Sequence, residues 1–485
     1  MKKLYSLFLM IVVSTAMAVA ATYSGTLPVM YINTENSTPI TSKDEYLNAT
    51  YYVDNLGLSG YESIGSADNQ LALKIKGRGN YTFYGFDKKP YRLKLDKKAA
   101  LLGMNKSKHF ALLAHADDNL GFLRNTMGFE LSRRMGLDFT PAQEPVEVVL
   151  NGDYIGLYFL TETIRVDSDR VNITEQADNE TDANNITGGW IVEIDNYWDA
   201  SQITITEGNG ETIRFTYKSP ENLSTEQTDY LTNLTTVTNK AIYADDKSSQ
   251  EWEKLIDLDS LAAFYIIQEV MDNSESFHGS CYFHKDRGAD TKIIFGPVWD
   301  FGNAFHRGTD KYIWQDPPFG QTWIAEMVKF PRFQEKYKKV WYKFLANDYA
   351  SLDQFATDFV NKITKAAASD YSRWPSYGNA DMANAKNSFL NMMHAKVNWL
   401  KQQWGESSVV NLAAASPLTV TASSDGTLTL SEEATAISVY DLSGRTVTAE
   451  LTSPTTAKIA NASGIYIVRV QAANASKTAK VVIPQ

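Results

Sequence analysis

Cysteine is nearly absent from this sequence of 485 residues, because Cys281 is the only one. A single thiol cannot form an intramolecular disulfide, and it excludes metal sites built on several cysteines. We therefore expect the fold to be held together by its apolar core. Cys281 lies in an apolar-rich run, between Ser280 and Tyr282, and is expected to be a small buried residue.

The sequence also lacks an excess of positive charge. Its 57 acidic and 46 basic residues give a formal net charge of -11. General binding to nucleic acid needs a basic surface, so we expect no nucleic-acid partner. Hydrophobic residues make up 44% and charged residues 21%, which is typical of globular proteins, and the length suggests two to four domains.

Long hydrophobic runs are absent as well. Lys2 and Lys3 precede a short apolar stretch, Leu4–Val13, and small residues follow it at Ala16, Ala18 and Ala20. This order predicts an export signal over residues 1–20. The stretch is short for a membrane anchor, so we expect no transmembrane segment once the signal is cleaved.

The first region of the exported part, residues 26–194, is expected to be rich in strands. Leu71–Ile75 alternates apolar and polar residues, as a half-buried strand does. Asn151-Gly152-Asp153 lies between two apolar runs and predicts a hairpin. One helix is expected here, over Phe122–Met135, with Gly136 as its stop.

The second region, residues 224–404, is expected to be mostly helical. Apolar residues recur at helical spacing in three segments, 252–271, 352–368 and 382–404. A strand pair is expected to interrupt them, at residues 281–284 and 292–295. A strand-rich part followed by a helix-rich part is the α+β pattern.

The third region begins at residue 410, where the composition shifts to Ala, Ser and Thr. Short strands are expected at residues 418–422, 427–430, 437–440, 465–470 and 480–483. Turns at Gly426, Gly444 and Gly464 separate them. This regular spacing predicts a small all-β sandwich over residues 410–485.

A basic cluster lies in the first region. Within 21 positions of an acidic chain stand Lys74, Lys76, Arg78, Lys88, Lys89, Arg92 and Lys94. Several of them alternate along predicted strands, and the glycines beside Arg78 let backbone N–H groups approach an anion. The cluster therefore suits a phosphate or a polyanion. The alternative is a solvated strand face, which runs of charge often are.

An acidic cluster lies in the second region. Asp272 and Glu275 follow a predicted helix, and Asp300 follows a strand. Mg²⁺ prefers carboxylate oxygens, and a carboxylate at a helix end can orient an attacking hydroxyl. The alternative reading of Asp300 is a turn or N-cap residue.

A series of short motifs resembles one known family. In chain order they are KGRGN (76–80), KKPYRLKL (88–95), LLGM (101–104), LRN (123–125), ELSRRMG (130–136), NGDYIGLY (151–158), TE (161–162), GWIVEID (189–195) and GPVWDF (296–301). Together they resemble the CotH (spore-coat protein H) kinase domain across residues 26–405. The resemblance implies an α+β fold, an atypical two-lobed protein-kinase-like domain, that transfers phosphate from ATP to Ser/Thr of secreted or surface proteins.

The resemblance also implies roles for individual residues. The nucleotide phosphates are expected to face Arg78, Asn80, Lys89, Arg92 and Lys94. Glu130, on a helix, is implied to orient one of these bases, as the helical glutamate of ordinary kinases does. Asp300 matches the family's metal-binding aspartate and is expected to hold Mg²⁺ or Mn²⁺.

The catalytic loop departs from the family pattern. Counting back from Lys285-Asp286 places Glu275 where relatives carry an aspartate, and Asp272 becomes the catalytic residue only if the loop shifts. Glutamate can accept a hydroxyl proton, but its extra methylene displaces the carboxylate by roughly 1 Å, which can cost about 100-fold in rate.

The tail has a resemblance of its own. Residues 437–445, 464–470 and 480–483 are similar to a type IX secretion sorting domain. That family implies recognition by the type IX secretion machinery and a secreted or cell-surface location. The alternative is a generic sandwich that binds carbohydrate or spaces the preceding domain.

Three functions therefore compete. The first is an exported ATP-dependent protein kinase. The second is a catalytically inactive kinase fold that acts in surface assembly or binding, favoured by the glutamate at 275 and by the scarcity of ATP outside cells. The third is a carbohydrate-active or adhesive surface protein, suggested by an aromatic content of 12%.

Overall fold

The computed structural model describes residues 22–483 except for 196, 207–209, 211, 316–321, 407–418, 432, 443, 461–462 and 472–475. The predicted export signal, residues 1–20, lies outside the described residues. The chain divides into two compact units, Met1–Glu406 and Ser407–Gln485. Each unit has a hydrophobic core of its own.

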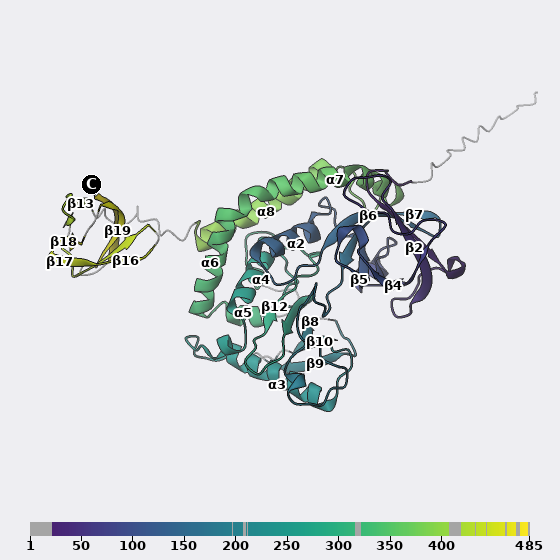
Figure 1. Ribbon diagram of the computed structural model, residues 1–485, viewed down its shortest axis with the longest axis horizontal. Coiled ribbons are helices and arrows are strands. Elements are labelled where there is room, and N and C mark those ends of the chain that lie inside the picture. Colours follow the sequence, from purple (N-terminus) through teal and green to yellow (C-terminus); the bar gives the residue numbers. More distant parts are fainter. Residues whose placement is uncertain are drawn as a thin grey trace, which may run out of the picture. The chain divides into compact units, whose positions relative to one another are not determined.

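A closed seven-stranded barrel begins the first unit (Figure 1). Around the barrel the strands are β1 (Val29–Thr34), β2 (Leu47–Asp54), β3 (Leu71–Gly77), β4 (Tyr91–Ala99), β5 (Ser107–Leu113), β7 (Asp153–Glu162) and β6 (Gln143–Leu150). Neighbours pair antiparallel, except that β1 and β6 close the barrel in parallel, with Val29 opposite Glu147. Alternating residues such as Leu73 and Leu93 fill the interior, so their polar neighbours face outward.

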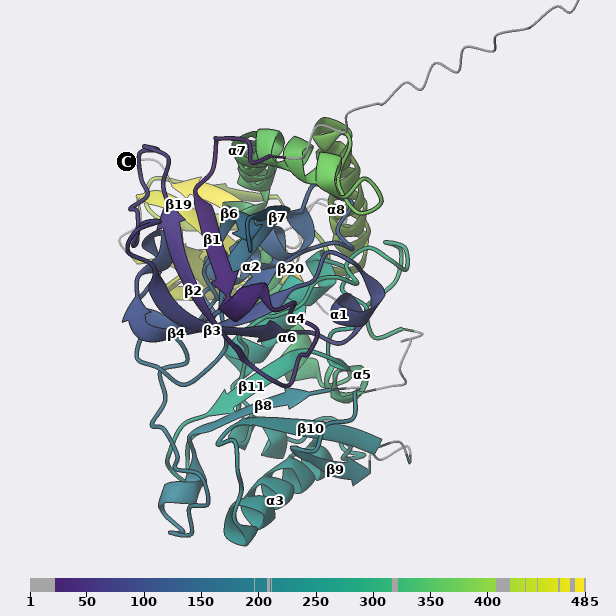
Figure 2. The same cartoon turned by 90° about the vertical axis from the view of Figure 1, so that its right-hand side faces the viewer.

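A five-stranded sheet forms the other part of the first unit. Its order is β12 (Ile294–Phe295), β11 (Cys281–Lys285), β8 (Trp190–Ile194), β10 (Thr212–Ser219) and β9 (Gln202–Thr206), and Figure 2 shows β11, β8, β10 and β9 in this order. Strand β8 was expected in the first, strand-rich region, but Trp190 pairs with Lys285 across to β11. All five residues of β8 are buried, which explains its central position.

Helices pack around this sheet and against the barrel. They are α1 (Tyr81–Gly85), α2 (Leu123–Met135), α3 (Thr225–Ile242), α4 (Leu258–Val270), α5 (Trp323–Met327), α6 (Pro331–Asn347), α7 (Leu352–Arg373) and α8 (Met382–Trp404). Short 3-10 turns are η1 (Glu35–Ser37), η2 (Leu101–Gly103), η3 (Asn185–Thr187), η4 (Glu251–Lys254) and η5 (Tyr349–Ser351). Figure 1 shows α7 beside β7 of the barrel, and α8 above α2.

The helix expected over 252–271 is interrupted. A 3-10 turn ends at Lys254, and α4 begins at Leu258. The Asp257 carboxylate accepts a hydrogen bond from the N–H of Ser260 at 2.7 Å and so caps α4. The strand expected over 292–295 is also shorter than predicted, because only Ile294 and Phe295 form it. The helix before Gly136 is confirmed, and that glycine ends it with a left-handed φ of 75°.

The second unit is all-β, as expected. One sheet holds β13 (Val420–Ala422), β14 (Thr427–Leu430), β18 (Thr456–Ile459) and β17 (Ala449–Ser453), and the other holds β16 (Thr446–Val447), β15 (Ala436–Asp441), β19 (Gly464–Gln471) and β20 (Ser476–Ile483). Both sheets contribute to one hydrophobic cluster, which includes Leu428 and Val468, as in a sandwich. Across both units, no described helix combines the length and apolarity that a membrane span requires.

Candidate functional site

Asp300 lies in an exposed turn that follows β12. Its φ of 58° is left-handed, and hydrogen bonds hold the turn on both sides. The carboxylate accepts a bond from the N–H of Gly302 at 3.1 Å, and the carbonyl accepts one from Nδ2 of Asn273 at 3.1 Å. These hydrogen bonds therefore hold the Asp300 carboxylate in a defined position at the surface, next to the five-stranded sheet.

Arg78 reaches this turn from the barrel. It follows β3 directly, and its N–H donates to the carbonyl of Pro90 at 3.1 Å. The guanidinium lies over the ring of Trp299, with 5.4 Å to the ring centre, next to Asp300 in sequence. Burial lowers the pKa of Arg78, and the Asp300 carboxylate acts in the opposite direction. The structure thus brings one residue of the basic cluster to the predicted metal ligand.

Glu275 lies beside the same aspartate. Its carboxylate accepts a hydrogen bond from the side-chain amide of Asn303, and the side chain is partly buried. Burial, followed by repulsion from the Asp300 carboxylate, raises the pKa of Glu275 to about 7. Near neutral pH the Glu275 carboxyl is therefore protonated in part of the molecules and ionised in the others.

Asp117 is a further carboxylate at this place, and it was not predicted from the sequence. A methyl group at Gly302 would lie 3.1 Å from Oδ2 of Asp117 and 3.1 Å from Oδ1 of Asp300. Burial, with Asp300 as the next cause, raises the pKa of Asp117 to about 6. Arg124 links the segment of Asp117 to the turn that follows Asp300, since its guanidinium donates to the carbonyls of Asp117 and Ala304.

The other predicted phosphate-binding residues make contacts of their own. The Lys89 ammonium donates to the carbonyl of Phe83 at 2.7 Å and therefore holds the α1 turn. Asn80 accepts a hydrogen bond from Lys43. Arg92 and Lys94 are exposed on the outer face of β4, and Arg92 is close enough to lower the pKa of Arg78. Of the predicted bases, only Arg78 contacts the ring next to Asp300.

Asp272, the second candidate for the catalytic carboxylate, is buried away from this turn's surface. Its Oδ1 lies 2.9 Å from Nζ of Lys396, which is also 3.1 Å from Oε2 of Glu269. All three side chains are buried, so the lysine is surrounded by two carboxylates inside the core. Of the two candidates, Glu275 is the one next to Asp300.

Glu130 lies on α2, as expected, but its carboxylate pairs with its own helix. It is 3.1 Å from Arg133 and 2.7 Å from Arg134, at helical spacings of three and four residues. These arginines, rather than a base of the barrel, are therefore the partners of Glu130.

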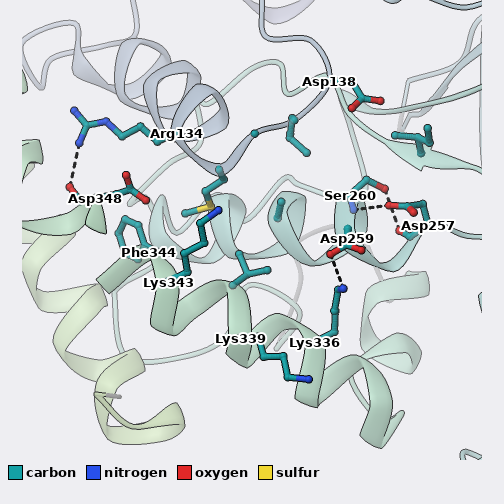
Figure 3. Close-up of a pocket in the computed structure, with 16 residues that line it drawn as sticks. Arg134, Asp138, Asp257, Asp259, Ser260, Lys336, Lys339, Lys343, Phe344 and Asp348 are labelled. Atoms are coloured by element: carbon teal, nitrogen blue, oxygen red, sulfur yellow. Dashed lines mark hydrogen bonds and ion pairs between the residues drawn. The ribbon is translucent and has the colours of Figure 1, made fainter. Parts of the chain in front are cut away.

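A separate pocket of about 440 Å³ lies between α2, α4 and α6 (Figure 3). None of the predicted site residues lines it. Among its charged residues, Lys336 pairs with Asp259 at 2.5 Å. Because neither Arg78 nor Asp300 lines it, this pocket is not the place where these two residues meet.

The residues around Asp300 fit a divalent cation only together with further ligands. Within the described ranges, no three or more His, Cys, Asp or Glu side chains are grouped to hold a metal by themselves. Mg²⁺ is usually bound by one or two carboxylates plus phosphates and water, so Asp300 with Glu275 or Asp117 meets that need. A cation here would also relieve the repulsion that raises the pKa of Glu275 and Asp117.

Comparison with known proteins adds two family matches. Residues 74–403 match the CotH kinase protein family, over more than half of the 485 residues. Residues 419–484 match the secretion system C-terminal sorting domain. No curated protein matches the chain. Among solved structures, the twitchin kinase region of C. elegans aligns at 10% identity over 90% of this chain and 88% of that one, with a TM-score of 0.18.

Proposed function

Since the chain belongs to the CotH kinase protein family and carries a type IX sorting domain that directs it to the cell surface or into the medium, we propose that it is an exported protein kinase. The reaction would transfer the terminal phosphate of ATP to Ser/Thr of a secreted or surface protein. In this proposal the barrel and the helix-covered sheet act as the two lobes of an atypical kinase-like domain.

The observation that carries the proposal is the meeting of three groups from distant parts of the sequence. Arg78 stacks on Trp299 beside Asp300, and Glu275 lies within the electrostatic reach of the same carboxylate. A fixed cation opposite two carboxylates is what phosphoryl transfer requires, since its catalysis consists mainly of positioning and charge stabilisation.

Each residue then has a task. The Arg78 guanidinium would bind oxygens of the nucleotide phosphates, with Arg92 adding positive charge at longer range. Asp300 would hold Mg²⁺ or Mn²⁺, which when bound neutralises charge on the phosphates. Asp117 is the second carboxylate available for that ion.

Glu275 would accept the proton of the acceptor hydroxyl. A cation held by Asp300 would relieve the repulsion that helps to raise the pKa of Glu275, and so would favour the ionised form, which is the form that acts as a base. The amide of Asn303 holds the carboxylate in place, and this contact offsets part of the freedom that glutamate has over aspartate.

The test is transfer of labelled γ-phosphate by the full chain to Ser/Thr-containing peptides and to itself, with Mg²⁺ or Mn²⁺. We expect transfer that Asp300→Asn removes, because asparagine lacks the negative charge that would hold the metal. Asparagine keeps the hydrogen bond to Gly302 and tolerates the left-handed backbone, so this variant should keep the melting behaviour of the wild type. The absence of transfer from the wild type, under conditions in which a family relative is active, would count against the proposal.

A second candidate is an inactive kinase fold that binds nucleotide or a surface partner. It is favoured by Glu275 itself, which carries an extra methylene, is engaged by Asn303 and is partly protonated near neutral pH. A ligand that binds the folded state must raise the melting temperature. Stabilisation by ATP and Mg²⁺ without any transfer would identify this second function.

A further inference from the structure

The outer face of β3 and β4 carries four cations in two rows. Lys74 lies directly opposite Lys94, and Lys76 lies directly opposite Arg92. Their neighbours Leu73, Ile75, Leu93 and Leu95 point into the barrel core, so the four cations share the outer face. We call Lys74, Lys76, Arg92 and Lys94 the basic ladder.

The ladder is electrostatically unfavourable in the protein alone. Side chains directly opposite each other on paired strands have Cβ atoms about 5 Å apart, and like charges there are destabilising. Within the part of the chain that the structure describes, no carboxylate forms an ion pair with Lys74, Arg92 or Lys94. By contrast, Lys98 of the same strand pairs with Asp167 at 3.3 Å.

Neighbouring groups respond to the positive charge of the ladder. The Lys76 ammonium lies 4.8 Å from the ring centre of Tyr46. Burial, followed by Arg92, lowers the pKa of Lys76, while the carboxylates of Asp44 and Glu221 act in the opposite direction. His109, opposite Lys94 on β5, has its pKa lowered to about 3 by burial and by surrounding cations that include Arg92 and Lys94. Asp44 and Glu221 therefore compensate the positive charge of the ladder in part, at Lys76, whereas Lys74, Arg92 and Lys94 form no ion pair within the described residues.

The ladder leads to the site described above. Arg78 continues the same face of β3 and reaches Trp299, beside Asp300. Strands rise about 3.3 Å per residue, so the row of Lys76 lies about 7 Å from Arg78 and the row of Lys74 about 13 Å. An extended peptide has the same repeat, with side chains on one face about 7 Å apart.

We infer that the basic ladder binds an acidic segment of the acceptor protein, in an extended conformation, with Asp or Glu at alternate positions about two to five residues from the phosphorylated Ser/Thr. The inference rests on the proposed function for its link to phosphorylation. The match between the spacing of the cations and that of an extended chain favours a peptide over a polysaccharide. The ladder ends at Asp96, two positions beyond Lys94, which limits the acidic stretch to a few residues.

Binding is tested first, because it does not depend on catalysis. The probe is a fluorescent peptide with one serine flanked by alternating glutamates, compared by anisotropy with the same peptide carrying lysines in place of the glutamates. We expect full-length wild type and Asp300→Asn to prefer the acidic peptide, and rising salt to weaken this binding. The double variant Lys74→Glu/Lys76→Glu should bind the acidic peptide about tenfold more weakly or worse.

A matched control is Lys365→Glu, which reverses an exposed lysine on α7 and should leave peptide binding unchanged. The double variant should also keep the thermal stabilisation by ATP and Mg²⁺ seen with wild type. Loss of that stabilisation would overturn the inference, because the ladder would then serve the nucleotide. Equal binding of the two peptides, or tighter binding of polyglucuronate lost in the same variant, would overturn it as well.

The experiments distinguish failure of the proposed kinase function from failure of the inference about peptide binding. If the ladder binds the acidic peptide but no peptide receives phosphate, the inference about peptide binding stands and the proposed kinase function is refuted. Transfer that is equally fast for acidic and basic peptides, and unaffected in the double variant, would keep the kinase and remove the ladder from substrate recognition.

Discussion

Replacing Glu275 by glutamine tests the electrostatics of the site without any ligand. The pKa of Glu275 rises from the ordinary value of 4.5 to about 7 in the folded protein, because of burial and the Asp300 carboxylate. The folded state therefore holds this proton more tightly than the unfolded state does. The resulting stability is fully present below pH 4.5 and is lost as the pH rises through about 7.

The magnitude follows from the same shift. At 1.36 kcal/mol per pH unit, a rise from 4.5 to about 7 is worth about 3 kcal/mol, and partial access of solvent to the side chain reduces this to about 2 kcal/mol. Glutamine keeps the shape and the contact with Asn303 but carries no charge. We expect Glu275→Gln to be more stable than wild type by about 2 kcal/mol at pH 8.5 and nearly equal to it at pH 4.5.

Urea unfolding followed by tryptophan fluorescence measures this difference in one unit alone, because all 10 tryptophans lie before residue 407. The control is Glu62→Gln, which changes an exposed glutamate of the same unit. A stability difference for Glu275→Gln that does not change between pH 4.5 and pH 8.5 would refute the placement of Glu275 beside Asp300.

Three further predictions concern buried contacts of the same unit. Lys88 and Asp370 form an ion pair of 2.7 Å at 1% exposure each, so Lys88→Met should cost about 3 kcal/mol in urea unfolding. Adding Asp370→Asn should recover much of that loss, because it removes the unpaired charge and keeps an acceptor for the N–H of Leu157. Equal costs for the single and double variants would contradict this. Gly128→Ala would place a methyl 2.2 Å from the ring of Phe301, so it should lower the free energy of unfolding by about 1–3 kcal/mol. Because Phe301 follows Asp300, the variant should also show a smaller rise in melting temperature with ATP and Mg²⁺. An unchanged free energy of unfolding together with an unchanged rise in melting temperature would contradict this prediction. Burial raises the pKa of the Cys281 thiol, so a thiol reagent should label it only in urea, and rapid labelling of the native protein would contradict its buried position.

Local signals in the sequence predicted local structure well. The hairpin around Asn151-Gly152-Asp153 forms between β6 and β7, because turn chemistry acts over a few residues. Closure of the barrel by Val29 and Glu147 had no such signal, since the partners are far apart in sequence. The position of β8 beside β11 was missed for the same reason.

The site was predictable only in part. Family motifs named Arg78 and Asp300, and the structure brings these two together although 221 residues separate them. Asp117 has no motif and enters the site through folding alone. Glu130 was assigned a distant base, but Arg133 and its neighbour are closer partners on the same helix.

The most direct test of the account is a crystal structure of the full chain with Mg²⁺ and a non-hydrolysable ATP analogue. The account predicts that the phosphates lie against the Arg78 guanidinium and that the metal is bound by the Asp300 carboxylate. An analogue bound in the pocket between α2, α4 and α6, or phosphates that contact neither residue, would contradict it.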